Sequence, residues 1–364
     1  MAIDLYDTMT LLGVLDKQRP DPLFFLQFFP DVIEFTTEKI AFDEISEDRY
    51  VLAPFVAPHV EGRVMARGGF DTRSFKPAYV KPKHDIDVMQ QFQRKAGESL
   101  VTGSLTPQQR YDATIAENFR LEREAIERRI NWMCAQVLVE GAVVIEGEDY
   151  PRVTVDFGRD GDLSEVLTST ARWGENAANP LGDINTKMRL SRKLSGGRTV
   201  DIIMGEEAYD RFYMNDDVKE LLNVNYRIGG TAADAPILGM GDNDKDAELK
   251  AVLAGGQSAN RVRIWTYAGY YHVRDPDTGV LTEGWYIDPN AVVGVGNKLQ
   301  GKQTFGAIKD PNAGLRAMRM FPRIIDKKND DPAKEYTLTQ SAPLPIALEP
   351  NNSWKLQVHD ADDS

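Results

Sequence analysis

The feature that most constrains the fold of this 364-residue chain is a predicted helix over residues 106–140. Thr106 is a good N-cap, Pro107 suits the first helical position, and Gln109 completes a capping box. Gly141 is expected to end the helix, because glycine readily takes the left-handed conformation found there. At 1.5 Å per residue the helix would be about 51 Å long. A mean helix has only about 11–12 residues, so this one is predicted to be the spine of a domain.

Apolar side chains recur at near-helical spacing along this predicted spine, which indicates one buried face. Opposite charges four residues apart, such as Arg120 with Glu124 and Arg123 with Glu127, are expected on its wetter side. The pattern predicts a helix that lies in a core along one face only. The apolar positions are Tyr111, Ile115, Phe119, Ile126, Ile130, Met133 and Val137.

Residues 55–84 are predicted to form a long hairpin that is too poor in apolar residues to be stable alone. Its centre is Gly68-Gly69, a pair that can take the positive φ values of a tight turn. Prolines in its flanks indicate strand edges that no neighbouring strand completes. The segment holds six bases against two acids, a net charge of +4 in a chain of net charge −13. We expect the bases to contact another subunit, and they are Arg63, Arg67, Arg73, Lys76, Lys81 and Lys83.

Residues 1–50 are expected to form an extended arm, because a Pro-Asp-Pro stretch excludes a helix in its middle. The arm holds eleven acids against four bases, a net charge of −7. Four phenylalanines then follow within seven residues, and two interpretations of them remain open. They form a buried core segment, or they anchor the arm on a neighbouring subunit, as apolar interface patches do. In the second case the contact residues are Phe24, Phe25 and Phe28.

The remainder of the chain alternates predicted strands and helices, which is typical of the α+β class. Residues 199–305 are interpreted as a domain of about 100 residues inserted into another domain. The sequence contains no internal repeat and no low-complexity tract. Strands are predicted at 143–145, 153–155, 200–204, 262–267, 285–287, 292–293, 336–339 and 346–348, and helices at 181–194 and 206–222.

Composition excludes several classes of protein. The net charge of −13 argues against a nucleic-acid reader, which needs clustered Lys and Arg to bind phosphates. Cys134 is the only cysteine, so no intrachain disulfide and no cysteine-based zinc site can form. The first residues do not resemble a signal peptide, and no apolar run approaches the roughly 20 residues that a membrane helix needs. We therefore expect a soluble protein that is cytoplasmic when made.

Two motifs imitate binding sites, and both are incomplete. Residues 296–303 match the phosphate-binding G-x-x-x-x-G-K pattern, but Gln303 stands where a Ser or Thr hydroxyl should bind magnesium. Residues 242–246 imitate the start of a calcium loop, with Ala247 in place of its turn glycine. The histidines lack a paired metal-ligand spacing, and no serine lies in a Gly-x-Ser-x-Gly elbow. We predict no catalytic, cofactor-binding or metal-binding residue, and expect the chain not to be an enzyme.

Five segments, spread over most of the chain, match the sequence of a known family. They are Asp21-Pro22-Leu23-Phe24, Phe35-Thr36-Thr37-Glu38-Lys39, Arg67-Gly68-Gly69, Tyr79-Val80-Lys81-Pro82-Lys83-His84 and Glu335-Tyr336-Thr337-Leu338-Thr339-Gln340-Ser341-Ala342-Pro343-Leu344. In this order they resemble the major capsid protein of lambda-like tailed bacteriophages. Residues 160–320 resemble that family in their pattern of residue types more than in their identical residues.

The resemblance implies the shell fold that tailed-phage and herpesvirus capsids share. That fold contains an N-terminal arm, an extended β-hairpin loop, a peripheral domain with a long spine helix, and an inserted axial domain. The residues alone indicate the same four features in the same order. The implied bounds are 1–49 for the arm, 50–86 for the extended loop, 87–198 with 306–364 for the peripheral domain, 106–140 for its spine helix, and 199–305 for the axial domain.

The resemblance also implies a function. Such a chain self-assembles into hexamers and pentamers of an icosahedral head, which encloses double-stranded DNA without reading its sequence. The implied partners are a scaffolding protein, a portal and a decoration or cement protein, and the implied location is the virion after assembly in the host bacterial cytoplasm. The alternative is another self-assembling virion protein, such as a tail-tube or connector subunit.

Overall fold

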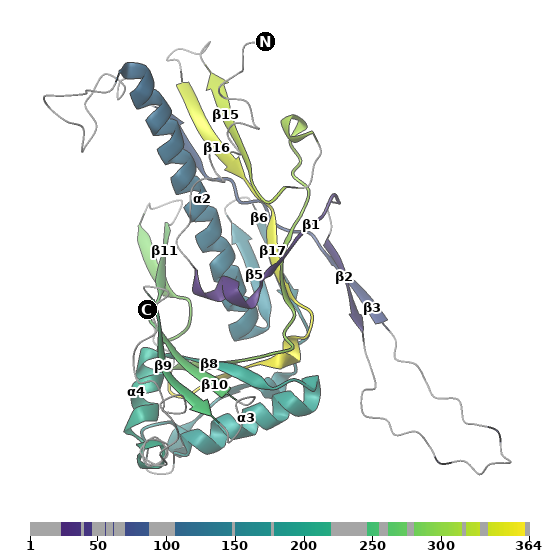
Figure 1. Ribbon diagram of the computed structural model, residues 1–364, viewed down its shortest axis with the longest axis vertical. Helices are drawn as coiled ribbons and strands as arrows, with labels where there is room; N and C mark the ends of the chain where they lie inside the picture. Colours follow the sequence, from purple (N-terminus) through teal and green to yellow (C-terminus); the bar gives the residue numbers. More distant parts are fainter. Residues whose placement is uncertain are drawn as a thin grey trace, which may run out of the picture.

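A computed structural model shows an elongated molecule built around one long helix (Figure 1). None of its described helices is long and apolar enough to cross a membrane. The structure describes residues 23–37, 40–45, 55, 61, 70–86, 106–147, 150–175, 178–219, 246–254, 261–274, 280–314, 318–327 and 334–360.

The long helix, α2, spans Pro107–Glu140, as the sequence predicts. The Thr106 hydroxyl accepts a hydrogen bond from the backbone N–H of Gln109, and the Gln109 side chain accepts one from the backbone N–H of Thr106. Gly141 ends the helix at φ 69°. The Arg159 guanidinium donates to the carbonyls of Leu138 and Val139 there, so a cation satisfies the negative end of the helix. Burial lowers the pKa of Arg159 to about 10.

The largest sheet separates two hydrophobic cores. Side chains alternate between the two faces of a strand, and in β8 Ile202 and Met204 pack toward helices α3 and α4 while Ile203 packs toward α2. Helices α3 (Pro180–Ser195) and α4 (Glu206–Met214) lie together at one end of the molecule (Figure 1). In spatial order the strands are β7 (Ser164–Val166), β18 (Ser353–Gln357), β13 (Ala291–Gly296), β8 (Thr199–Gly205), β10 (Arg261–Tyr267) and β9 (Ala247–Ala254).

Two strands of this sheet come from outside residues 199–305. β7 precedes that range, and β18 lies near the C-terminus and pairs with both β7 and β13. β18 lies in the range predicted for the peripheral domain but belongs to this sheet, where its Trp354 packs against β13 at Gly294. A Cβ at position 294 would lie 2.0 Å from the indole ring. The close approach therefore needs glycine at that position.

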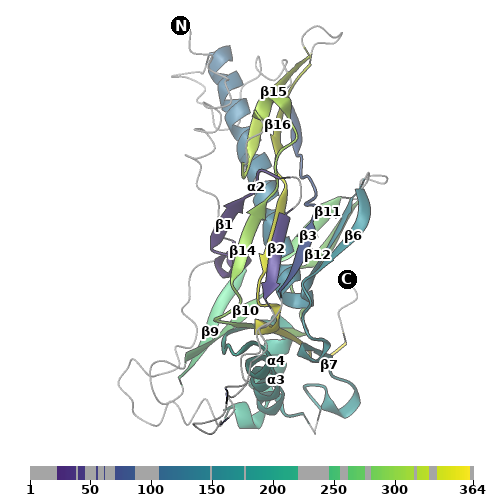
Figure 2. The ribbon, with the colours of Figure 1, turned by 90° about the vertical axis from the view of Figure 1, so that its right-hand side faces the viewer.

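Two three-stranded sheets lie along α2 (Figure 2). The first contains β15 (Phe321–Lys327), β16 (Lys334–Gln340) and β4 (Lys83–Ile86), which pairs residues far apart in the sequence. The second contains β1 (Asp31–Glu34), β14 (Gly301–Phe305) and β17 (Pro343–Ala347). The strands that lie along α2 therefore come from segments before the helix in the sequence (β1 and β4) and from segments long after it (β14, β15, β16 and β17).

Two short hairpins flank α2, and several single turns of 3-10 helix connect the elements. The strands predicted at 143–145 and 153–155 are confirmed and pair as β5 (Ala142–Gly147) and β6 (Tyr150–Asp156). The other hairpin consists of β11 (Tyr270–Arg274) and β12 (Leu281–Trp285). The 3-10 turns are η1 (Phe24–Phe28), η3 (Gly161–Leu163), η4 (Ser169–Ala171), η5 (Pro311–Ala313) and η6 (Pro350–Asn352).

The long hairpin differs from its prediction in the strand that forms its first arm. β2 (Ile40–Ile45) pairs antiparallel with β3 (Phe70–Phe75), so the first arm precedes the expected range of 55–84. Ile40 is fully buried and Phe75, opposite it, packs on the main core, so the base of the hairpin is fixed to the body. The predicted turn at residues 67–69 lies outside the described residues.

Helix α4 is shorter than the predicted helix over 206–222. Asn215 ends it in an extended conformation, with φ −67° and ψ 132°. The Asn215 side chain accepts hydrogen bonds from the backbone N–H groups of Asp217 and Val218. Residues 216–219 are helical again, so Asn215 interrupts the predicted helix, and its side chain caps the N-terminus of the second part.

Candidate assembly surfaces

The phenylalanine segment lies in the core of its own subunit. Phe25 is fully buried and Phe24 is 6% exposed. The Phe25 ring contacts Tyr267 with centroids 4.7 Å apart, and Phe24 contacts Trp265 at 5.3 Å. The Phe25 backbone N–H donates to the Asn131 side chain of α2 at 3.0 Å. Within one subunit the packing of Phe24 and Phe25 fits the core interpretation, and their contact with a neighbouring subunit stays a prediction.

Phe28 differs from these two residues, because it is only half-buried at the edge of the same core. Its contact with a neighbouring subunit stays a prediction. Phe29 is fully buried, and its carbonyl accepts a hydrogen bond from the Gln303 side chain at 2.8 Å. The segment as a whole ties the start of the described chain to α2, β10 and β14.

Three of the basic residues of the hairpin have described side chains. Lys76, Lys81 and Lys83 are exposed, and the Lys83 ammonium lies 3.6 Å from the centre of the Tyr336 ring. The Lys81 ammonium lies over the Tyr79 ring at 4.9 Å. These three cations lie on the segment that leads from the hairpin into β4.

Three of the expected contact residues cannot be placed by their side chains. Arg63 and Arg67 lie outside the described residues. The backbone of Arg73 is in β3, opposite Phe42 of β2. Their role, like that of the three lysines, stays a prediction.

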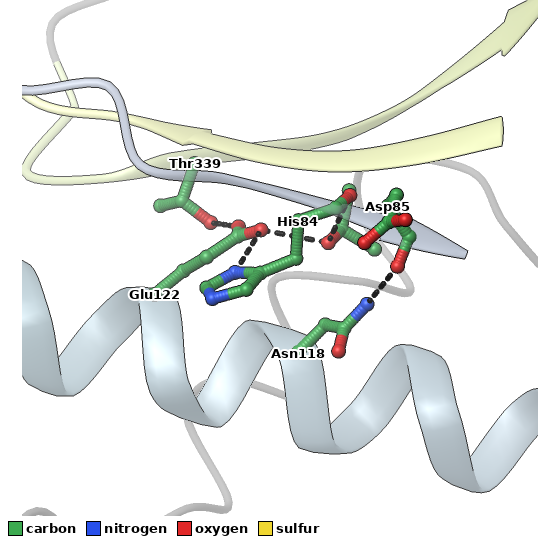
Figure 3. Close-up of polar contacts among 6 residues, drawn as sticks. His84, Asp85, Asn118, Glu122 and Thr339 are labelled. Atoms are coloured by element: carbon green, nitrogen blue, oxygen red, sulfur yellow. Dashed lines mark hydrogen bonds and ion pairs between the residues drawn. The ribbon is translucent and has the colours of Figure 1, made fainter. Parts of the chain in front are cut away.

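A buried carboxylate joins the spine to the strand that follows the hairpin (Figure 3). Glu122 of α2 is 0% exposed, and its oxygens accept hydrogen bonds from Thr337 at 2.7 Å and Thr339 at 2.6 Å, both on β16. The Nδ1 atom of His84, on β4, lies 3.3 Å from the same carboxylate. One helix turn earlier, the Asn118 amide donates to the backbone carbonyl of Asp85 at 3.2 Å. The contacts hold β4 and β16 together on the helix.

Burial raises the pKa of Glu122, and the bonds from Thr339, Thr337 and His84 oppose that rise. A carboxylate without water loses solvation that only specific donors replace. The His84 side chain is 39% exposed, so one partner of the buried acid remains in contact with solvent.

The sequence carries a signal for this cluster that the periodicity analysis misses. The apolar stripe runs through Ile115, Phe119 and Ile126, and Glu122 occupies the stripe position between the last two. An acidic residue at a core position needs buried donors. Their identity follows only from the pairing of β4 with β16.

The glycine-rich loop at 296–303 connects two strands and does not form a phosphate-binding loop. Its Asn297 N–H donates to the Arg198 carbonyl and its Lys298 N–H donates to Asn352, so protein acceptors occupy these amides. Cys134 is fully buried, and burial raises its pKa, which suits a small core residue. Within the described part of the chain, no group of three or more acidic, His or Cys side chains could hold a metal. Most of 242–246 lies outside that part.

The fold is that of a phage capsid subunit. A crystal structure of a prophage protein from E. coli CFT073, described as a capsid protein, matches with a TM-score of 0.71 and 23% identity over 97% of this chain and 99% of that one. The profile of the family described as phage major capsid protein E matches residues 7–358, and the chain belongs to that family.

The sequences of known major capsid proteins align with this chain over nearly their whole length. The major capsid protein of Escherichia phage lambda is 27% identical over 98% of this chain and 100% of its own length, and that of Escherichia phage N15 is 28% identical over 96% and 98%. The function is therefore that of a major capsid protein of the lambda-like phages, a structural component of the virion. Proteins of this class associate with themselves into shells.

Proposed function

We propose that copies of this chain assemble as hexamers and pentamers into an icosahedral head that encloses double-stranded DNA. The observation that carries the proposal is the β2–β3 ribbon, which leaves one side of the body and forms a sheet of two strands only (Figure 1). An isolated two-stranded ribbon is marginally stable. We infer that a neighbouring subunit supports it, and that the basic residues of the segment over 55–84 contact acidic surfaces there.

Electron microscopy of the purified full-length chain tests this proposal. The expected result is closed shells with hexameric and pentameric units. Tubes or rings would instead support the alternative, a tail-tube or connector subunit. Particles of a single subunit at assembly concentrations would contradict self-association through this ribbon.

We further propose that the wall of the head holds its DNA without binding it tightly. The net charge of −13 repels phosphates on average. Purified protein is expected to retain no duplex DNA at physiological salt, and micromolar binding in a filter assay would contradict this. A scaffolding protein, a portal and a decoration or cement protein are proposed partners, assembly is proposed in the host cytoplasm, and no catalytic activity is proposed.

The division into domains is also a proposal. The proposed parts are the arm at 1–49, the extended loop at 50–86, the peripheral domain at 87–198 with 306–364, and the axial domain at 199–305. Helix α2 lies within the range proposed for the peripheral domain. The large sheet adds β7 and β18 to the strands of the axial range. Limited proteolysis of the unassembled subunit is expected to cut the extended loop first, because the domains on either side are packed around α2.

A further inference from the structure

The segment that leaves the hairpin is attached to the body at three points. The Tyr79 hydroxyl donates to the carbonyl of Ala307 at 2.7 Å, and Val80 forms an isolated β-bridge with Ser341. The third point is β4, which is an edge strand, because β16 is its only partner among the described strands. An edge strand detaches with the loss of one ladder of hydrogen bonds instead of two. β4 is therefore the attachment whose strength can be adjusted most readily.

His84 supplies the ionisable contact among these attachments. Its Nδ1 atom lies 3.3 Å from the carboxylate of Glu122, which is fully buried on the spine helix (Figure 3). The two other partners of that carboxylate, Thr337 and Thr339, are hydroxyl donors without charge. A buried charge is costly unless an opposite charge compensates it. Within the described residues, the Glu122 carboxylate therefore has a charged partner only when His84 is protonated.

The neighbouring charges do not replace His84 in this role. Lys83 and Asp85 belong to the other face of β4, because side chains alternate between the two faces of a strand. Other charged side chains of β16, β15 and the adjacent turns of α2 contact partners of their own. These contacts are Lys83 over Tyr336 at 3.6 Å, Tyr111 with Glu335 at 2.7 Å, Arg120 with Glu117 at 2.6 Å and with Glu124 at 2.5 Å, Arg123 with Glu127 at 3.1 Å, and Arg323 with Asp310 at 2.6 Å.

The two members of the pair differ in their access to protons. The His84 side chain is 39% exposed and the Glu122 side chain 0%, so the imidazole exchanges protons with solvent while the chain remains folded. Histidine ordinarily changes its charge between pH 5 and 8. Protonation of the ring converts a neutral donor into a charged one, which binds a carboxylate more strongly. Burial raises the pKa of Glu122, so further acidification neutralises the carboxylate and weakens the pair again.

We propose that the His84–Glu122 pair is a proton-dependent latch that sets how firmly the extended hairpin is held on the spine helix. The latch is strongest in mildly acidic solution, where the imidazole is charged and the carboxylate is still ionised. It weakens toward alkaline pH, where the ring is neutral. Only residues 76–82 separate β3 from β4, and two of the seven are prolines, which stiffen the connection. A looser β4 therefore gives the whole hairpin a wider range of positions.

Hydrogen exchange of the unassembled full-length subunit tests the latch. Mass spectrometry follows the backbone amides of β4 at pH 6 and pH 8, and each rate is compared with the intrinsic rate at that pH to give a protection factor. In the natural chain, protection of β4 is expected to be at least about threefold higher at pH 6, because a charged hydrogen bond is roughly twice as strong as a neutral one. His84→Gln, which donates a hydrogen bond but does not titrate, should show equal protection at both values. His272→Gln, at an exposed position of β11, is the matched control and should keep the difference.

Glu122→Gln provides an independent test at the other member of the pair. Without the carboxylate, a charge on His84 gains nothing from the contact, so the pH difference should again disappear while circular dichroism shows a folded chain. This variant decides the outcome if His84→Gln does not fold. Equal protection of β4 at both pH values in the natural chain, or a difference that persists in a folded variant, would overturn the latch. The latch is a property of the single subunit, so shells formed by the natural chain would still support the proposed function, and the two proposals can fail separately.

Discussion

The two halves of the spine helix lie in different kinds of core, although one apolar stripe runs through both. From Ile126 onward α2 lies in the main core, and Ile126, Ile130 and Leu138 are fully buried among apolar side chains. Before Glu122 the helix contacts a small cluster with Ile115 and Phe119. Hydrogen bonds from β4 and β16 to this half of the helix supplement the small apolar cluster.

The difference teaches that a long helix can combine a fixed end with an adjustable one. Burial of apolar surface is non-directional and insensitive to pH. Hydrogen bonds to a buried carboxylate depend on geometry and on protonation. The second half of α2 contacts the phenylalanine segment, where Asn131 bonds to Phe25. The first half contacts β4, the strand that follows the extended hairpin, through Asn118 and Glu122. A movement of that hairpin would therefore be transmitted through β4 to the first, polar half of α2 before the second half.

The largest effect is expected from Phe25, which contacts the apolar half. Phe25→Ala should lower the free energy of unfolding by about 3–5 kcal/mol, as buried Phe-to-Ala changes do. Phe28→Ala is the matched control and should cost less, because Phe28 is half-buried. Urea unfolding of the unassembled subunit measures both. Equal costs would show that Phe28 is as much a core residue as Phe25.

The two halves of α2 can be compared directly with one substitution in each. Ile130→Ala should cost about 2–5 kcal/mol in the main core, and Ile115→Ala should fall near the lower end of that range. Ile115 belongs to a smaller cluster, so fewer neighbours lose contacts. Chemical denaturation of both variants checks the order. A larger cost for Ile115→Ala would reverse the comparison.

Removing a donor from the buried carboxylate is expected to have a moderate effect. Thr337→Val should lower stability by about 1–3 kcal/mol, because Glu122 then lacks one of its hydrogen bonds at a fully buried position. In a Glu122→Met background the same change should cost much less, since no charge remains to be satisfied. Thr154→Val, at an exposed position of β6, is the control. Equal costs in both backgrounds would mean that packing, and not the hydrogen bond, explains the loss.

The polar half should also respond to pH. The pKa of Glu122 is raised in the folded state, so the folded chain holds this proton more tightly than the unfolded chain does. The contribution of this group to stability is therefore greatest below its unfolded pKa, and it is lost as pH rises through the folded pKa. The Glu122→Gln variant does not lose stability in this way, because glutamine does not ionise. Its stability relative to the natural chain should increase with pH, and a constant difference between pH 4 and 8 would contradict the burial effect.

The smallest effect on the free subunit is expected at the hairpin. Arg67→Glu with Arg73→Glu should change its free energy of unfolding by less than about 1 kcal/mol, the usual range for exposed charges, while closed shells fail to form. Assembly of the natural chain should also weaken as salt screens these contacts. Electron microscopy and thermal melting together check both expectations. Normal shells from this variant would show that the charge of the hairpin is incidental.

Local sequence determines the spine. The capping box at Thr106, the αL glycine at 141 and the apolar stripe between them depend on residues within one or two helical turns, and such interactions can be predicted without knowing the rest of the fold. The same holds for the β5–β6 hairpin. The acid–base balance of each segment is likewise a property of the sequence, and it indicates which surfaces attract each other.

The tertiary structure decides which partners these elements find. Glu122 and Thr337 are separated by 215 residues, and no periodicity relates them. The strand that pairs with β3 comes from 40–45, because β-strand pairing depends on partners that local propensity does not specify. From the sequence alone, Phe25 could be a core residue or an interface residue. Its contacts with Tyr267 and Asn131 place it in the core of the subunit. Burial is a property of three-dimensional neighbours, whereas helix formation and capping are properties of near ones.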